Sequence, residues 1–287
     1  MAAQVQSFFD PGTHTFSYVV HDPATRQAAI IDPVLDFDPI AARTGLGSAQ
    51  ALVDHANRHA LRVQWILETH AHADHLTAAQ WLKTQYPQAQ LAIGQGICAV
   101  QAHFAPLFGQ GDRHVADGSQ FDHLFADEEV FGVGELAARV IAVPGHTSDS
   151  NAYLIGDALF TGDSLFMPDA GTARCDFPGG DAATLYRSIQ RLYELPDATR
   201  VFICHDYGPG GRPVACETTI GEQRRNNVHV GDGTSESGFV ALRLARDATL
   251  TLPALIIPSL QVNLRGGALP EPEHNGTRYL RIPLDSF

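Results

Sequence analysis

Hydrophobic and polar positions along the first half of the chain alternate in short blocks that predict strands and helices in turn. Two β-rich runs at 16–22 and 27–33 are separated by four residues that include Pro23, which predicts a hairpin. Apolar residues at helical spacing and short apolar runs then predict a helix, a strand, a helix and a strand at 51–63, 63–70, 76–86 and 89–94.

The second half of the chain repeats this alternation. A strand is predicted at 138–147, followed by a hairpin at 151–166 with a Gly-Asp pair at its tip. Asp181 is the predicted N-cap of a helix at 182–195. A strand, a short polar helix and a further helix are predicted at 200–208, at 220–227 and near 238–246. Strands mixed with helices throughout indicate an α/β (α+β) layered fold.

The length of 287 residues fits one large domain with a modest extension. We expect a catalytic domain at 1–230 and a C-terminal extension at 231–287 that packs on the same domain. Residues 95–135 are predicted to be an insert that forms a lid or a dimer contact. Five histidines are expected at the surface: His55, His59, His103, His114 and His123.

The charge and the cysteines exclude several classes of protein. The chain has 19 Lys and Arg residues against 32 Asp and Glu residues, a net charge of −13, which argues against a nucleic-acid partner. No apolar run is long enough to span a bilayer and the N-terminus lacks a secretory signal, so we expect a cytoplasmic protein without a membrane partner. The four cysteines show no C-x-x-C spacing, which indicates reduced thiols. Cys175 is either an oxidisable thiol or a small packed residue, and packing is the favoured interpretation.

The stretch THAHADH at 69–75 carries the most informative chemistry. It places His70, His72, Asp74 and His75 directly after a predicted strand. Three further donors follow or end later predicted strands: His146, Asp163 and His205. Because layered α/β proteins build their sites on loops at strand ends, we expect these side chains to converge.

Imidazole and carboxylate donors are typical of sites for Zn(II), Fe(II), Mn(II) or Ni(II). His70 and His72 are two residues apart, so in an extended segment they would face one ion together. Asp74 and His75 could then serve a second ion, and the two oxygens of Asp163 could bridge both. Seven such residues at four strand ends favour a metal site over ordinary polar loop residues.

The motifs THAHADH, PGHTSDS, FTGDSLF and ICHDYG, in this order, resemble the metallo-β-lactamase superfamily over about residues 14–230. The resemblance implies a four-layer αββα sandwich with metals in a cleft at one edge of the two sheets. It implies a first metal site at His70, His72, His146 and Asp163. It implies a second metal site at Asp74, His75, Asp163 and His205.

Two groups within this superfamily match the complete donor set. Two-zinc hydrolases such as glyoxalase II, which cleave thioesters of glutathione, use all of the donors. Persulfide dioxygenases resemble a one-iron enzyme whose triad maps to His70, His146 and Asp163. In that case His72 and His205 would be hydrogen-bonding groups instead of ligands.

The segment 163–182 is similar to the persulfide dioxygenase group. The resemblance places Arg174 and Asp176 beside the iron and the glutathione, Tyr207 near the substrate and Arg225 among the glutathione contacts. The chain departs from the Gly-Cys-Gly-Arg-Thr-Asp-Phe pattern of many relatives, because it reads Gly-Thr-Ala-Arg-Cys-Asp-Phe at 171–177.

The resemblance therefore implies a dioxygenase with one Fe(II) per chain that oxidises glutathione persulfide with O2 and water to sulfite and glutathione. Its partners would be enzymes of sulfide oxidation, and a homodimer is compatible with the sequence. The alternative is a two-zinc hydroxyacylglutathione hydrolase of the glyoxalase II type. A third hypothesis is a non-catalytic metal-binding or persulfide-binding sensor, which the complete donor set disfavours.

Overall fold

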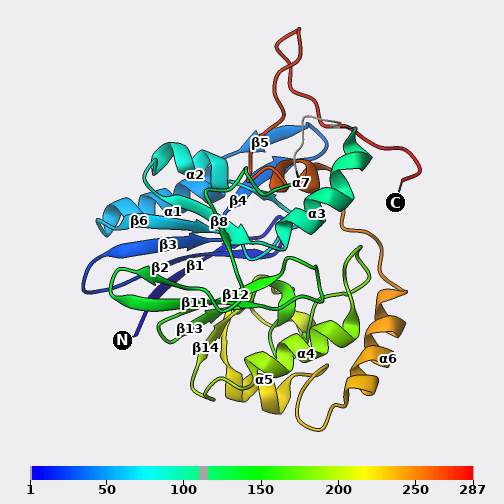
Figure 1. Ribbon diagram of the computed structural model, residues 1–287. Coiled ribbons are helices and arrows are strands. Elements are labelled where there is room, and N and C mark those ends of the chain that lie inside the picture. The colour runs from blue at the N-terminus through cyan, green and yellow to red at the C-terminus, as the bar shows by residue number, and fades with distance from the viewer. Residues whose placement is uncertain (1, 110–115, 287) are drawn as a thin grey trace.

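Two β-sheets face each other in the centre of the molecule, and helices cover their outer faces (Figure 1). The computed structural model describes residues 2–109 and 116–286. The first sheet has the strand order β1-β2-β3-β6-β8-β9, with bounds Gln4–Asp10, Thr15–His21, Gln27–Ile31, Arg62–Leu67, Gln90–Gly94 and His123–Phe125. The second has the order β10-β11-β12-β13-β14-β15, with bounds Val130–Val133, Leu136–Ala142, Asn151–Ile155, Ala158–Phe160, Arg200–Phe202 and Glu217–Thr219.

The remaining elements surround these sheets. A small sheet pairs β4 with β5 and β7, at Val34–Asp38, Arg43–Gly45 and Leu76–Thr77. The α-helices α1 to α7 are Gly47–Arg58, Ala79–Gln85, Ile97–Phe104, Ala182–Leu192, Ile220–Asn226, Glu236–Asp247 and Ile256–Asn263. Short 3-10 turns lie at Ala105–Phe108, Gly162–Ser164 and Pro209–Gly211.

The alternation of side chains along β2 shows how the layers are held together. Tyr18 and Val20 point between the two sheets, where they pack in one cluster with Tyr153 and Phe160. Val19 points the other way, into the cluster that the first sheet forms with its covering helices. Since successive side chains of a strand face opposite sides of a sheet, β2 is buried on both faces. This arrangement confirms the predicted αββα sandwich.

Several sequence predictions are confirmed in detail. β2 pairs with β3 as an antiparallel hairpin, and so does β12 with β13. Asp181 caps α4, because its side chain accepts a hydrogen bond of 2.7 Å from the backbone N–H of Thr184.

Two predicted helices begin or end elsewhere. The first covers Gly47–Arg58 instead of 51–63, because residues from Arg62 onward belong to β6. The second does not include Leu76 and Thr77, which form β7 and pair with β4. Pairing with a distant strand overrides the helical spacing of this short stretch.

The predicted insert at 95–135 is part of the sandwich. Ile97, Val100 and Phe104 of α3 are buried in the core beneath the first sheet, and β9 and β10 form edge strands of the two sheets. His103 is exposed, and His123 is half-buried with its Nε2 atom 2.7 Å from Glu129, whereas His114 lies outside the described residues.

Another surface prediction fails for His55. Its ring is buried against Phe8 of β1, although His59 one turn later is exposed.

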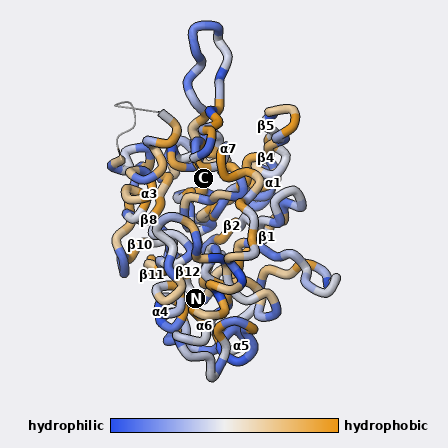
Figure 2. The backbone as a smooth tube through the Cα atoms, turned by 90° about the vertical axis from the view of Figure 1, so that its right-hand side faces the viewer, coloured by the Kyte–Doolittle hydropathy of each residue, from blue (hydrophilic) through white to orange (hydrophobic). Residues whose placement is uncertain are grey.

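The C-terminal extension reaches both halves of the sandwich. α6 packs against α4, and α7 packs against β7. From residue 268 onward the described chain has neither helix nor strand, and part of it projects from the body as a mostly hydrophilic loop (Figure 2). Within the described ranges, no helix has the length and apolar character needed to cross a bilayer.

The cap of α4 gives a test of this fold. Asp181→Ala removes the acceptor for an N–H group that the helix itself cannot pair, so we expect the free energy of unfolding to fall by about 1 kcal/mol. Urea unfolding followed by circular dichroism measures this change. Asp181→Asn retains a capping oxygen and should remain close to the original stability. Equal losses in both variants would contradict the capping role.

Candidate metal centre

All seven predicted donors meet at one edge of the sandwich. Six of them are buried, and Asp74 is half-buried. They come from four segments that follow β6, β11, β13 and β14. The convergence predicted from strand ends is therefore present in the structure.

His70, His146 and Asp163 form one group of three potential ligands whose donor atoms lie within 4.8 Å of one another. The Oδ2 atom of Asp163 lies 3.5 Å from Nε2 of His146 and 3.9 Å from Nε2 of His70. Two imidazoles and one carboxylate thus surround a common point.

A second group contains His72, Asp74, His75 and His205. Nε2 of His205 lies 3.1 Å from Oδ2 of Asp74 and 3.3 Å from Oδ1 of Asp163. The two oxygens of Asp163 therefore face different groups, as expected for a bridging carboxylate. His70 and His72 fall in different groups, although their ring centroids are only 4.0 Å apart. That they serve one ion together stays a prediction.

Unpaired buried atoms show that these residues fit a metal ion. Within the described part of the chain, four donor atoms at the centre are buried without a hydrogen-bond partner: Nδ1 of His72, Nε2 of His75, Nε2 of His205 and Oδ1 of Asp163. Buried polar atoms are normally paired, and a shared cation satisfies several of them at once. The donor set contains nitrogen and oxygen but no thiolate, which suits iron or zinc.

A buried carboxylate behind the ligands fixes which nitrogen each ring presents. Oδ1 of Asp32 lies 3.0 Å from Nε2 of His72, which leaves Nδ1 of that ring free. The hydroxyl of Thr69 donates its single hydrogen to Oδ2 of Asp32 over 2.9 Å. It can therefore only accept from Nδ1 of His70, at 3.0 Å, so Nε2 of His70 is free to bind a metal.

His146 is oriented in the same way. Its Nδ1 atom lies 2.7 Å from the carbonyl oxygen of Arg174, which can only accept, so Nε2 is the free donor. The preceding Gly145 has a φ of +138°, and a Cβ atom there would lie 2.3 Å from the backbone of Leu185. Only glycine permits this close approach to α4.

Burial and the neighbouring carboxylates shift the pKa values of the imidazoles at the site in opposite directions. Burial lowers the pKa of His70 well below its usual value, and the neighbouring His72 lowers it further. Burial would also lower the pKa of His205, but the carboxylates of Asp163 and Asp74 raise it. Burial raises the pKa of Cys204 well above its usual value, and the neighbouring Asp32 raises it further. This nearby thiol therefore stays protonated.

A cleft of about 820 Å³ opens onto the centre. Asp74, His146 and Asp163 line it, whereas the other four donors do not. An incoming molecule therefore meets the His146 and Asp163 side of the first group.

The predicted glutathione contacts have different positions. Arg174 lines the cleft, but its Nε and Nη2 atoms donate to Asp176 and its Nη1 atom donates to the carbonyl oxygen of Thr251. Tyr207 also lines the cleft and is 57% exposed.

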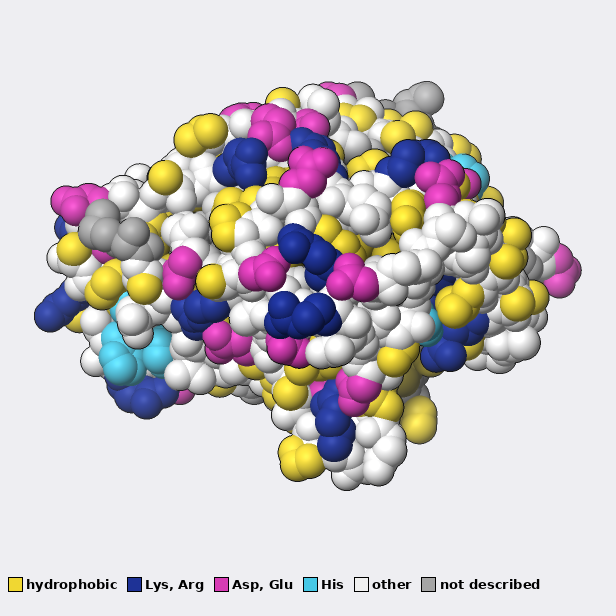
Figure 3. Space-filling view, turned by 90° about the horizontal axis from the view of Figure 1, so that it is seen from below, with side chains coloured by type: hydrophobic (Ala, Val, Ile, Leu, Met, Phe, Trp, Pro, Cys, Tyr) yellow, Lys and Arg dark blue, Asp and Glu magenta, His cyan; other side chains and the backbone are white. Residues whose placement is uncertain are grey.

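Arg225 does not reach the cleft. It lies on α5, where it pairs with Glu222 and Asp197, so the structure does not bring this predicted contact to the site. Seen from below, the molecule shows Lys and Arg side chains beside acidic ones (Figure 3).

Helix α6 contributes residues that sequence reasoning missed. Arg246 lines the cleft, and among residues 2–109 and 116–286 no acidic side chain forms an ion pair with it. Arg243 is buried and donates to the carbonyl oxygen of Thr172, while Asp247 accepts from the backbone N–H of Cys175. α6 thereby holds the loop that carries Arg174. The sequence predicted this helix, but no motif connected it to the donors.

Burial shifts the pKa values of two more residues at this loop, His229 and Cys175. Burial, together with the positive charges of Arg243 and Arg246, lowers the pKa of His229 to about 4. This ring is therefore neutral near pH 7. Burial raises the pKa of the Cys175 thiol to about 12, which agrees with a packed residue instead of an oxidisable thiolate.

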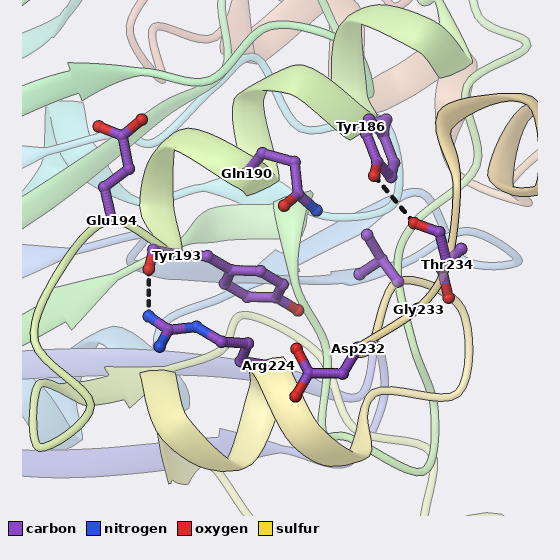
Figure 4. A pocket seen from close by; sticks show the side chains of 10 residues that line it. Tyr186, Gln190, Tyr193, Glu194, Arg224, Asp232, Gly233 and Thr234 are labelled. Carbon is purple, nitrogen blue, oxygen red and sulfur yellow. Dashed lines mark hydrogen bonds between the residues drawn. The ribbon is translucent and has the colours of Figure 1, made fainter.

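A separate pocket of about 460 Å³ lies between α4, α5 and the segment before α6 (Figure 4). Arg224 donates to the carbonyl oxygen of Tyr193, and the hydroxyl of Tyr186 donates to the carbonyl oxygen of Thr234. No group of potential metal ligands in the described chain lies among the residues that line this pocket.

Comparisons with known proteins agree with this site. The sequence profile of the metallo-β-lactamase superfamily matches residues 10–205. A probable metallo-hydrolase from Burkholderia pseudomallei (strain 1710b) is 49% identical over 99% of this chain and 99% of its own length. The chain spans only 64% of a β-lactamase hydrolase-like protein from Agrobacterium fabrum, with 52% identity over 98% of this chain.

Persulfide dioxygenases are also similar. The mitochondrial persulfide dioxygenase ETHE1 of Homo sapiens is 30% identical, covering 92% of this chain and 88% of its own. The crystal structure of ETHE1 from Myxococcus xanthus has a TM-score of 0.73 and 31% identity, covering 92% of this chain and all of that one. With this fold, this donor set and a profile that matches most of its length, the chain belongs to the metallo-β-lactamase superfamily.

Proposed function

We propose that the protein is an Fe(II)-dependent persulfide dioxygenase that converts glutathione persulfide, O2 and water to glutathione and sulfite. The observation that carries the proposal is the group of His70, His146 and Asp163, in which two imidazoles and one carboxylate meet without His72. Such a triad is typical of non-haem iron oxygenases. The similarity to persulfide dioxygenases supports the same assignment.

The residues of the first group prepare the site for one ion. When bound, Fe(II) supplies the redox chemistry that lets O2 react with the persulfide sulfur, which zinc cannot do. His70 and His146 present Nε2, because Thr69 and the carbonyl of Arg174 hold their Nδ1 hydrogens. His72 and His205 would act through hydrogen bonds beside the ligands.

The cleft suits a small anionic thiol derivative. Its metal end is acidic, with Asp74 and Asp163, whereas Arg246 stands on the wall that the C-terminal extension supplies. Phe177 and Leu252 add apolar surface to the same cleft. In our proposal the persulfide sulfur faces the first group and a glutathione carboxylate pairs with Arg246, because the donors of Arg174 are already engaged.

The second group favours one alternative. His72, Asp74, His75 and His205 could hold a second ion, and Asp163 faces both groups. A two-zinc glutathione thioester hydrolase of the glyoxalase II type would use the same seven residues to activate water. The description of the relative from Burkholderia pseudomallei as a probable metallo-hydrolase agrees with this alternative.

The wider setting belongs to the same proposal. All four cysteines are free, as expected in the reducing cytoplasm. We also propose a catalytic domain at 1–230 and an extension at 231–287. The protein would act beside enzymes of sulfide oxidation and would form a homodimer.

Metal content and oxygen uptake distinguish the two functions. We expect protein purified without chelators from cells grown with both metals to hold about one iron per chain and to consume O2 when glutathione persulfide is added. Elemental analysis and an oxygen electrode make these measurements. Two zinc ions per chain, thioester cleavage and no O2 uptake would instead establish the hydrolase.

Asp163 is the residue that both groups share, so its removal should affect every metal. Asp163→Ala is expected to lose at least about tenfold in metal retention and essentially all activity. Elemental analysis after dialysis tests this, with Asp197→Ala as a control because Asp197 is exposed and pairs with arginines of α5, away from the metal centre. Full iron content and turnover in Asp163→Ala would refute the ligand assignment.

Arg246 should act on substrate binding alone. Loss of a charge-assisted hydrogen bond in Arg246→Ala should raise KM for glutathione persulfide about tenfold and leave kcat nearly unchanged. Arg225→Ala is the matched control, because it removes an arginine that lies outside the cleft. Steady-state kinetics that show equal KM values for Arg246→Ala and Arg225→Ala would exclude this contact.

A further inference from the structure

The last residue of α7 touches the metal-binding segment from a distant part of the sequence. Asn263 is 4% exposed, and its side-chain amide bonds the backbone between residues 72 and 77. Nδ2 donates to the carbonyl oxygens of His72, at 2.8 Å, and of His75, at 2.7 Å. Oδ1 accepts from the backbone N–H of Thr77 at 2.8 Å. Both hydrogens of the amide group therefore bond the backbone of candidate ligands, His72 and His75.

These carbonyl groups need a partner from outside the segment. Residues 68–75 form neither helix nor strand, so no regular ladder pairs their backbone groups. His72 and His75 are fully buried, which excludes water as an abundant substitute. A buried carbonyl left without a donor costs about 1 to 3 kcal/mol, and the segment would have to rearrange to avoid that cost.

Helix α7 is well suited to hold such a contact. Leu260 packs into the core beneath the first sheet, and Val262 packs with Leu35 and Leu76 in the cluster beneath the small sheet. Apolar packing on both sides fixes the position of the helix end. The amide of Asn263 therefore acts from a rigid element on an irregular one.

We propose that Asn263 is a positioning residue for the metal centre. By holding the peptide groups that follow His72 and His75, it keeps Nδ1 of His72 and Nε2 of His75 directed at the centre, where both atoms lack protein partners. The side chain of Asn263 bonds backbone atoms of this segment, so it acts through the two histidines and not on substrate. The inference rests on a metal ion that His72 and His75 contact, as ligands or through hydrogen bonds, and not on the persulfide reaction.

Binding of zinc to the metal-free full-length protein, measured by competition with a chromophoric chelator, tests the inference. Asn263→Ala removes all three hydrogen bonds and should weaken zinc binding about tenfold, as is typical when a group that supports a ligand is removed. Gln261→Ala is the matched control on the same helix. Gln261 is also a buried amide, but it bonds the backbone of Ile257 and Arg281 instead of the metal-binding segment.

A second measurement separates positioning from general stability. We compare the free energies of unfolding of the zinc-loaded and metal-free forms of each variant. The stabilisation by zinc should shrink in Asn263→Ala and remain at the original value in Gln261→Ala. A purely structural role would lower the stability of both forms by the same amount and leave zinc affinity unchanged, and that result would overturn the proposal.

A milder variant covers the case in which Asn263→Ala does not fold. Asn263→Ser keeps one hydroxyl donor, and we expect it to fold and to bind zinc at least about threefold more weakly than the original protein. A folded Asn263→Ser or Asn263→Ala variant with a smaller loss, or an equal loss in Gln261→Ala, would refute the positioning role. Oxygen uptake does not enter these measurements, so failure of the dioxygenase proposal and failure of this inference remain distinguishable.

Discussion

Burial of ionisable side chains at one edge of the sandwich is the constraint on which the rest of the structure depends. Charged groups and unpaired polar atoms are costly to remove from water, so each must find a partner inside the protein. Asp32 solves part of this problem, because its carboxylate accepts from the backbone and hydroxyl of Thr69 and contacts the ring of His72. Four potential ligand atoms at the centre remain unpaired, and a bound cation would offset the cost of burying them.

The sequence predicts the position of the donors better than their grouping. Sites are built on loops at strand ends, so histidines after β6 and after β14 could be expected at a common site. These strands belong to different sheets, and the packing of the two sheets brings their ends to one edge of the sandwich. The separation of His70 from His72 could not, because it depends on the contact of His72 with Asp32, which lies at the end of β3. A spacing of two residues describes an extended segment, whereas residues 68–75 form no strand.

The substrate side of the cleft was harder to predict, for a related reason. Arg225 and Arg246 are both arginines on helices near the end of the chain, and only the docking of α6 against α4 decides which of them lines the cleft. Residues 95–135 show the same limitation, since edge strands as short as β9 and β10 carry too little pattern to be recognised before their partners are known. Local pattern identifies elements, and long-range packing assigns their residues to a site.

The same long-range packing decides the chemistry of the site. The dioxygenase and the hydrolase would use nearly identical ligands, so the difference between them must arise from how firmly each group is held and which ion it retains. The holding contacts come from four separate places: Asp32 and Thr69 behind the rings, the carbonyl of Arg174, and Asn263 on α7. In the first group both imidazoles are held through Nδ1 with Nε2 free, and His146 and Asp163 face the cleft. In the second group Nδ1 of His75 and Nδ1 of His205 lie near the hydroxyl of Thr15. The second group depends on the segment 72–75, whose backbone is held by the C-terminal extension. Substitutions in that extension could therefore change the occupancy of the second group, and with it the reaction, without any change in a ligand.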